Sequence, residues 1–313
     1  MEQFYSRLCL PHEQNFSTKQ LFLLKLLVTC VFLGRAWQSI FMNIPLSELL
    51  WDEYLLHDTI EWLTGNSWEH YVKTSDPFIQ NLQTTFGIIW LICGGLCWGD
   101  WLKYKISRFF YLFGSVLLFF LSFLYFKELF YSWGQWAEYS LQVGSPIVLY
   151  LVALGKVQNS PALRFWVQIL IAVTFFSHGL YAYGYYPQPG AWVDWCMRVF
   201  FMNEKTARSF LVIIGILDML KLLIIFIPVR WLQLSMIWYC VAWGFVTALA
   251  RIVANFSHDL PIEALLQYTP ETLFRLVHGG VPLLLVLLWQ HKNYAYNQAS
   301  HSLSSSSSSS SVL

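Results

Sequence analysis

Two apolar runs joined by a turn, between Arg164 and Ile227, constrain the fold of this chain more than any other stretch. The first run ends in a Ser-His-Gly-Leu-Tyr motif at 177–181, and the second carries Gly215 and Asp218. Each run is about 20 residues long, and a helix of about 20 residues at 1.5 Å rise crosses the ~30 Å hydrocarbon core of a bilayer. The turn between the runs holds Pro, Gly and Trp residues and an amphipathic segment. The sequence therefore predicts a transmembrane hairpin with an interfacial cap.

Composition extends this interpretation to the whole chain. Of its 313 residues, 57% are hydrophobic and only 12% are charged, whereas a soluble domain has about a quarter charged residues. The deficit is spread along the chain, which indicates a polytopic membrane protein. A net charge of +1 leaves no field that would attract nucleic acid, so we expect the bilayer as a partner and no nucleic acid.

The fold class predicted from the apolar runs is all-α, a polytopic membrane helical bundle of about eight transmembrane helices with interfacial amphipathic caps. The predicted spans are Thr18–Phe41, Phe78–Trp98, Ser107–Phe130, Ala137–Leu154, Leu163–Gly184, Ala207–Ile227, Trp231–Ile252 and Leu273–Trp289. The predicted caps are Asn43–Asp76, Tyr185–Arg208 and Ala254–Pro270.

Shared features suggest an internal repeat of two four-helix halves, 18–156 and 163–289. In both halves a long cap follows the first span, and a Gly-x-Pro sequence, at 144–146 and 280–282, is expected to open the last one. Residues 1–17 form a polar amino-terminal segment. The low-complexity tail, 290–313, contains eight consecutive serines, and because serine buries no apolar area we expect it to be disordered.

Lys and Arg residues gather in the connections on the amino-terminal side of the predicted bundle. The first cap has Lys73 as its single Lys or Arg against seven acids, although the second cap, with Arg198, Lys205 and Arg208, argues the other way. The positive-inside rule then predicts a multi-pass protein of the inner (plasma) membrane, with both termini cytoplasmic and the caps outside.

Ionisable residues within the predicted spans are the candidate site residues, because charge in a membrane is costly and marks function by default. Asp218 and Lys221 are three residues apart on one helix and can pair with each other. The candidate polar pocket comprises Arg35, Lys127, His178, Asp218, Lys221, Arg251, Arg275 and His278.

Two interpretations of these residues stay open. In the first, Arg35, Lys127, His178 and Arg251, one from each ascending helix, surround an outward-facing pocket that binds an anionic or quinone-like headgroup or relays protons. Cap acids would close over that pocket: Asp52, Glu53, Glu138 and Glu271. In the second, each base merely neutralises a cap acid.

Other site chemistry has weaker support in the sequence. We expect no metal site, and the six cysteines form no disulfide framework. His178 and His278 are the one pair to consider for haem. The tryptophans beside the span ends, including Trp192 and Trp195, are expected to be interfacial anchors.

Three short motifs resemble the DoxX-like family of bacterial integral membrane proteins: Phe-Ser-His-Gly-Leu-Tyr-Ala at 176–182, Pro-x-Pro-Gly at 187–190, and Gly-Ile-Leu-Asp at 215–218. The resemblance covers mainly 163–227. It implies a four-helix membrane bundle, which matches one half of this chain and would make the whole a fused or duplicated form. Some members accompany quinone-linked sulfur oxidation or oxidative-stress complexes. The long acidic first cap and the eight-span length depart from the family pattern.

The sequence leaves three functions open, and enzymatic activity undecided. The first is an accessory subunit of a quinone-linked or redox membrane complex, with quinone as the cofactor and a membrane redox partner or a second copy of the chain as partner. The second is a small-solute or proton-coupled membrane carrier. The third is a non-catalytic membrane scaffold.

Overall fold

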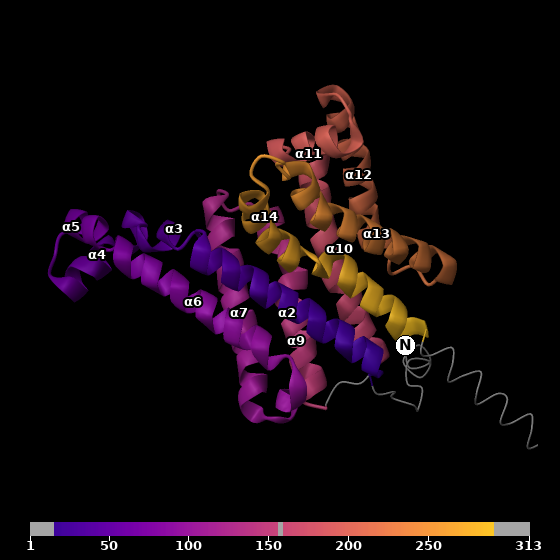
Figure 1. Cartoon of the computed structure of the whole chain (residues 1–313), viewed down its shortest axis with the longest axis horizontal. Coiled ribbons are helices and arrows are strands. Elements are labelled where there is room, and N and C mark those ends of the chain that lie inside the picture. The colour runs from indigo at the N-terminus through magenta and orange to yellow at the C-terminus, as the bar shows by residue number, and fades with distance from the viewer. Residues whose placement is uncertain (1–15, 156–158, 291–313) are drawn as a thin grey trace, which may run out of the picture.

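The computed structural model describes residues 16–155 and 159–290, and within these ranges all regular secondary structure is helical. Most of the predicted amino-terminal segment and nearly the whole serine-rich tail lie outside them. Figure 1 shows long helices packed side by side, with α4 (Glu53–Thr64) and α5 (Trp68–Thr74) projecting from one flank. The predicted all-α fold is therefore confirmed for the described residues.

Five helical segments in the described part of the chain are long and apolar enough to cross a membrane, which supports the prediction of several membrane-spanning helices. They are α2 (Thr18–Phe41), α7 (Lys105–Glu128), α10 (Pro161–Tyr183), α13 (Arg230–Asn255) and Pro261–Gln290. The last consists of α14 (Pro261–Arg275) and, after a turn at Leu276, a helix at 277–290.

The other three predicted spans correspond to α6 (Asp76–Leu96), α9 (Ser140–Ala153) and α12 (Glu204–Ile224). Two of these have 21 residues, but α9 has 14 and at 1.5 Å rise reaches only ~21 Å. The eight-span count and the two halves thus remain predictions.

Short helices cap one end of the bundle, which we call the cap end. They are α3 (Ser47–Leu50), α4 (Glu53–Thr64), α5 (Trp68–Thr74), α8 (Trp133–Glu138) and α11 (Gly190–Phe200), while a 3₁₀ turn, η1 (Gly99–Lys103), lies in the connection from α6 to α7. Local signals define several of them: Asp52 and Ser67 are N-caps of α4 and α5, and Gly65 ends α4 at φ 68°.

Two expected boundaries differ from the structure. The span predicted over 137–154 is broken at Tyr139, so that α8 is a separate short helix, and Pro146 lies inside α9 instead of opening it. The boundary predicted between the third cap, ending at Pro270, and the last span, beginning at Leu273, is also wrong, because α14 begins at Pro261 and runs through Pro270 to Arg275. Pro261 suits the first turn of a helix, where no backbone donor is needed.

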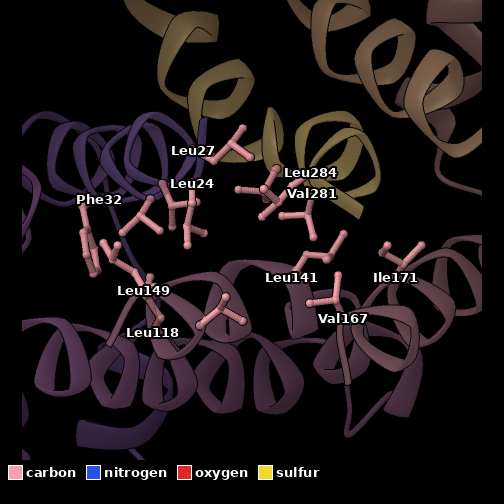
Figure 2. Packing of buried hydrophobic residues seen from close by; sticks show 14 of the residues in the cluster. Leu24, Leu27, Phe32, Leu118, Leu141, Leu149, Val167, Ile171, Val281 and Leu284 are labelled. Atoms are coloured by element: carbon pink, nitrogen blue, oxygen red, sulfur yellow. The ribbon is translucent and has the colours of Figure 1, made fainter. Parts of the chain in front are cut away.

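The apolar core lies between helices from both predicted halves. Leu24 and Phe32 of α2 pack in one cluster with Leu118 of α7, and Figure 2 shows Val281 and Leu284 beside Leu24, on the side toward Leu141. Helix α2 contacts α6 and α14, α10 contacts α12, and α7 contacts α9. This packing brings the ends of α2, α10 and α13, together with α8 and α14, to the cap end.

Candidate functional site

A network of ion pairs joins three helices at the cap end, with Arg275 of α14 at its centre. Arg275 Nη2 lies 2.9 Å from Glu138 Oε1 of α8, and its Nε lies 3.4 Å from Glu271 Oε1. Glu271 also accepts a hydrogen bond of 2.5 Å from Nε of Arg251 on α13. All of these side chains except Glu271 are largely buried, so the network is shielded from solvent.

Two histidines extend this network toward α10. His178 Nε2 lies 3.5 Å from Glu138 Oε2, and its ring stacks on that of His278 with centroids 5.1 Å apart and planes at 15°. His278 Nδ1 lies 2.8 Å from the carbonyl oxygen of Arg275, and its Nε2 has no hydrogen-bond partner among the described residues. The two histidines that the sequence offered as a pair to consider for haem therefore lie face to face, in a stacked ring contact.

Arg35 of α2 is the exception among the basic residues of the site, because its partners are neutral. Its side chain is 1% exposed. Nε and Nη2 donate to the amide oxygen of Gln142 at 3.0 and 2.7 Å, and Nη1 donates to Gln38 at 2.6 Å. The Cζ atom lies 3.6 Å from the centroid of the Phe274 ring. Within 16–155 and 159–290 no carboxylate forms an ion pair with it.

The site therefore has an excess of positive charge. Arg35, Arg251 and Arg275 contribute three guanidinium groups, while Glu138 and Glu271 contribute two carboxylates. A buried cation without a counterion is costly, and hydrogen bonds to amides offset only part of that cost. An anion bound near Arg35 would balance the charge.

Two cavities flank Arg275. The first, which we call the polar chamber, has about 940 Å³ of space including its opening to solvent. It is lined by Arg35, Gln38, Met42, Tyr125, Leu129, Gln135, Glu138, Tyr139, Tyr181, Pro189, Trp192, Gln267, Pro270, Glu271, Phe274 and Arg275.

The second cavity, the tryptophan pocket, has about 620 Å³ of space including its opening to solvent and lies between α10, α11, α12, α13 and α14. Its walls include Trp192, Trp195 and Trp243. Trp192 and Arg275 line both cavities, so the two adjoin there.

The structure separates two groups of predicted site residues from the chamber. Lys127 pairs with Asp52 at 2.7 Å and lies outside the lining of both cavities. Asp218 pairs with the fully buried Lys221, whose Nζ is enclosed by the rings of Phe175 and Tyr239 at 3.9 and 4.0 Å. Asp218 reaches the tryptophan pocket, as does His178, and no direct contact joins the two.

Cap residues show the electrostatic effect of their partners. The hydrogen bond from Lys127 holds the pKa of Asp52 below its ordinary value. The hydrogen bond to Asp58 raises the pKa of His57. The His57–Asp58 pair lies on the exposed surface of the first cap, whereas the Asp52–Lys127 pair is mostly buried and joins that cap to α7.

Several residues of the site carry no charge and could not be found by searching for intramembrane ions. Gln142 and Gln38 hold Arg35, and the ring of Tyr139 lies 4.8 Å from its Cζ. Trp192 and Trp195, expected to be interfacial anchors, line the tryptophan pocket, and the Arg251 Cζ lies 4.7 Å from the Trp195 ring. One indication in the sequence that these tryptophans could belong to a site was their position on α11, an amphipathic cap helix.

In the described part of the chain, no group of three or more His, Cys, Asp or Glu side chains could hold a metal ion. Donors and aromatic rings dominate the chamber instead. Such an arrangement can bind acceptor oxygens of a small ligand and stack against its body.

Comparisons with models of protein families, with curated proteins and with solved structures found no match to this chain. The resemblance of 163–227 to DoxX-like proteins thus stays a prediction, and the geometry of the site is the basis for proposing a function.

Proposed function

We propose that this chain is a multi-pass membrane protein that binds a small organic anion in the polar chamber. The observation that carries the proposal is Arg35, a buried guanidinium held only by amide oxygens and aromatic rings. Charge-assisted hydrogen bonds to an anion are about twice as strong as neutral ones, so ligand oxygens would gain most at this residue.

The surroundings of Arg35 support a ligand with a flat or aromatic body. Tyr125, Tyr139 and Tyr181 line the chamber, and Trp192 closes one side of it. Aromatic walls with a few polar donors are typical of small-molecule sites. The carbonyl oxygens of a quinone would accept the same hydrogen bonds, whereas the excess charge favours an anionic headgroup.

The alternative interpretation, that each basic residue only neutralises an acid, accounts for Lys127, Arg251 and His178 but does not account for Arg35. Lys127 pairs with Asp52, Arg251 with Glu271, and His178 lies within ion-pair distance of Glu138. These residues are sufficiently explained as structural pairs that fix the caps to the bundle. The ligand-binding role is therefore assigned to Arg35 and its neighbours.

A wider role as an accessory subunit of a quinone-linked or redox complex of DoxX-like type, in the bacterial inner membrane, is also proposed. The helix contacts support a duplicated form, because α2 with α6 corresponds to α10 with α12, and α7 with α9 to α13 with α14. Absorbance and mass spectrometry of the purified protein test this role. A co-purifying quinone would support it, and protein carrying only lipid would contradict it.

Anion binding is tested by calorimetry with benzoate, and with acetate as a smaller anion, on protein in lipid nanodiscs. We expect Arg35→Gln to weaken binding by about a hundredfold, the loss of roughly 3 kcal/mol that removal of a charged hydrogen-bond partner brings. The matched control is Arg164→Gln, a mostly buried arginine in the first turn of α10. It should bind as the wild type does. Failure of both anions to bind the wild type would overturn the proposal.

A second candidate is a proton-coupled carrier, favoured by the buried Asp218–Lys221 pair whose acid reaches the tryptophan pocket. Buried ionisable pairs in membrane helices often mark proton pathways. Proteoliposomes loaded with a pH-sensitive dye test it: benzoate-dependent proton movement that Asp218→Asn abolishes would support a carrier, and its absence in the wild type would exclude one for that substrate.

A further inference from the structure

The tryptophan pocket is apolar over most of its surface. Trp195 of α11, Leu211 and Ile214 of α12, and Trp243 and Val246 of α13 form its walls. Its polar groups are grouped at the wall toward the ion-pair network and at Asp218. A small soluble anion would leave these apolar walls without a partner, so they indicate a ligand with an apolar part.

The pocket reaches the lateral surface of the bundle. Helices α12 and α13 follow each other in the chain, but α12 packs mainly on α10 and α13 mainly on α14. Two residues of the pocket lining, Phe200 at the end of α11 and Val246 of α13, are 41% and 42% exposed. Because α13 is a helix suited to crossing a membrane, this side of the pocket would face lipid chains.

The pocket also adjoins the polar chamber, since Trp192 and Arg275 line both cavities. Trp192 stands on α11, a short cap helix, and its ring lies 5.9 Å from that of His178. A ligand with its head in the chamber therefore has apolar space within reach beside this ring.

We propose that the ligand is an acidic amphiphile with a single apolar chain, taken from the bilayer. Its head lies against Arg35 in the polar chamber, and its chain passes Trp192 into the tryptophan pocket. This inference rests on the proposed anion site and names the class of its ligand. The apolar chain of the ligand stays in apolar surroundings as it moves from the bilayer to the pocket, so only the acidic head must leave its lipid environment. Hydrogen bonds from Arg35 compensate for the loss of that environment.

The test uses a long-chain carboxylate that carries a photoreactive diazirine in the middle of its chain, added to the full-length protein in nanodiscs. After irradiation, mass spectrometry locates the labelled peptides. We expect labels on α11, α12 and α13 around Trp195, Leu211 and Trp243. An excess of benzoate, which competes for the head site alone, should lower this labelling about tenfold and leave labels on other lipid-facing helices unchanged.

Two neighbouring substitutions provide a matched comparison. Ala250→Trp fills the pocket that Ala250 lines, and should abolish the pocket labels while benzoate binding persists. Leu249→Trp lies at an adjacent position that is 49% exposed and outside the pocket lining. It should change neither the pocket labelling nor the binding of benzoate.

The outcomes separate this inference from the function on which it rests. Benzoate binding that depends on Arg35, together with labels spread evenly over the lipid-facing helices, overturns the amphiphile and leaves the anion site standing. Pocket labels that benzoate does not displace also overturn it, because head and chain would then belong to different ligands. No benzoate binding at all overturns the anion site itself.

Discussion

Arg35 and Gln142 meet through a shared acceptor: Nε and Nη2 of the arginine both donate to the single amide oxygen of the glutamine, at 3.0 and 2.7 Å. Gln142 is fully buried, and its own amide nitrogen has no hydrogen-bond partner among the described residues. A carboxylate would fit this position and would neutralise Arg35. The chain instead keeps the guanidinium charged and uncompensated beside the chamber.

Gln142→Glu is accordingly expected to supply the missing counterion and suppress anion binding. A carboxylate about 6 Å from the bound anion opposes it by roughly 3 kcal/mol at an effective dielectric constant of about 20, which is about a hundredfold in affinity. Calorimetry with benzoate in nanodiscs measures the effect.

The control for this substitution is Gln142→Met, which removes the amide and adds no charge. It should lose less than about tenfold in affinity, since Arg35 keeps its charge. Equal losses in Gln142→Glu and Gln142→Met would show that charge at Arg35 is not what binds the ligand.

The crossing of α10 and α12 makes a second, independent prediction about stability. A Cβ atom at Gly215 would meet the backbone nitrogen of Tyr183 and lie 2.9 Å from the carbonyl oxygen of Gly179. Gly215→Ala should force the helices apart and cost about 1–3 kcal/mol, seen as a lower thermal unfolding temperature in detergent.

Gly95→Ala is its matched control, because nothing lies within 4 Å of a Cβ atom there. Alanine in place of a helical glycine is neutral or stabilising where it fits, by up to about 1 kcal/mol. An equal fall in unfolding temperature for the two variants would contradict the close packing of α10 on α12.

Sequence reasoning could name the charged residues as candidates because charge in an apolar helix is visible in the chain alone. The Asp218–Lys221 pair was predictable, since residues three apart on a helix are neighbours whatever the tertiary structure. The contact of Arg275 with Glu138 was not, because Glu138 lies 137 residues away and is brought near by packing of α8 on α10.

The neutral residues escaped prediction for a physical reason. Gln142 in α9 is one polar residue in an apolar helix, and only its distance from Arg35 gives it a role. The boundary expected between Pro270 and Leu273 was wrong because proline disfavours a helix interior without forbidding it, and α14 continues through Pro270 to Arg275. The local preferences of residues favour certain positions for a helix end, and tertiary packing decides whether the helix ends there.

Asp52 offers a prediction for the first cap, where it serves two functions. It accepts a hydrogen bond of 3.1 Å from the backbone of Leu55 as the N-cap of α4, and it pairs with Lys127. Asp52→Asn keeps the cap, because asparagine caps as well as aspartate, and loses the ion pair. Asp52→Ala loses both, so thermal unfolding should rank wild type above Asn and Asn above Ala.

The contribution of that ion pair should depend on pH in a fixed direction. Lys127 holds the pKa of Asp52 below its ordinary value, so the folded state binds this proton more weakly than the unfolded state does. Stabilisation is then present above the unfolded pKa of about 3.9 and is lost as pH falls through the lowered folded value. The difference between wild type and Asp52→Asn should be present at pH 7 and shrink below about pH 4; a difference that grows on acidification would contradict the pairing.

The buried pair in α12 gives the largest expected change in stability. Lys221 is 0% exposed and Asp218 is 1% exposed, so Lys221→Met leaves a carboxylate without its counterion inside the bundle. Breaking a buried pair in this way costs about 3–5 kcal/mol, enough to lower the unfolding temperature or abolish folding in detergent.

The double variant Asp218→Asn with Lys221→Met removes both charges and should recover most of the loss, because a neutral amide is far less costly to bury than a carboxylate. If the double variant is no more stable than Lys221→Met alone, the loss comes from packing of the lysine between Phe175 and Tyr239, and the charge of Asp218 is not what the lysine neutralises.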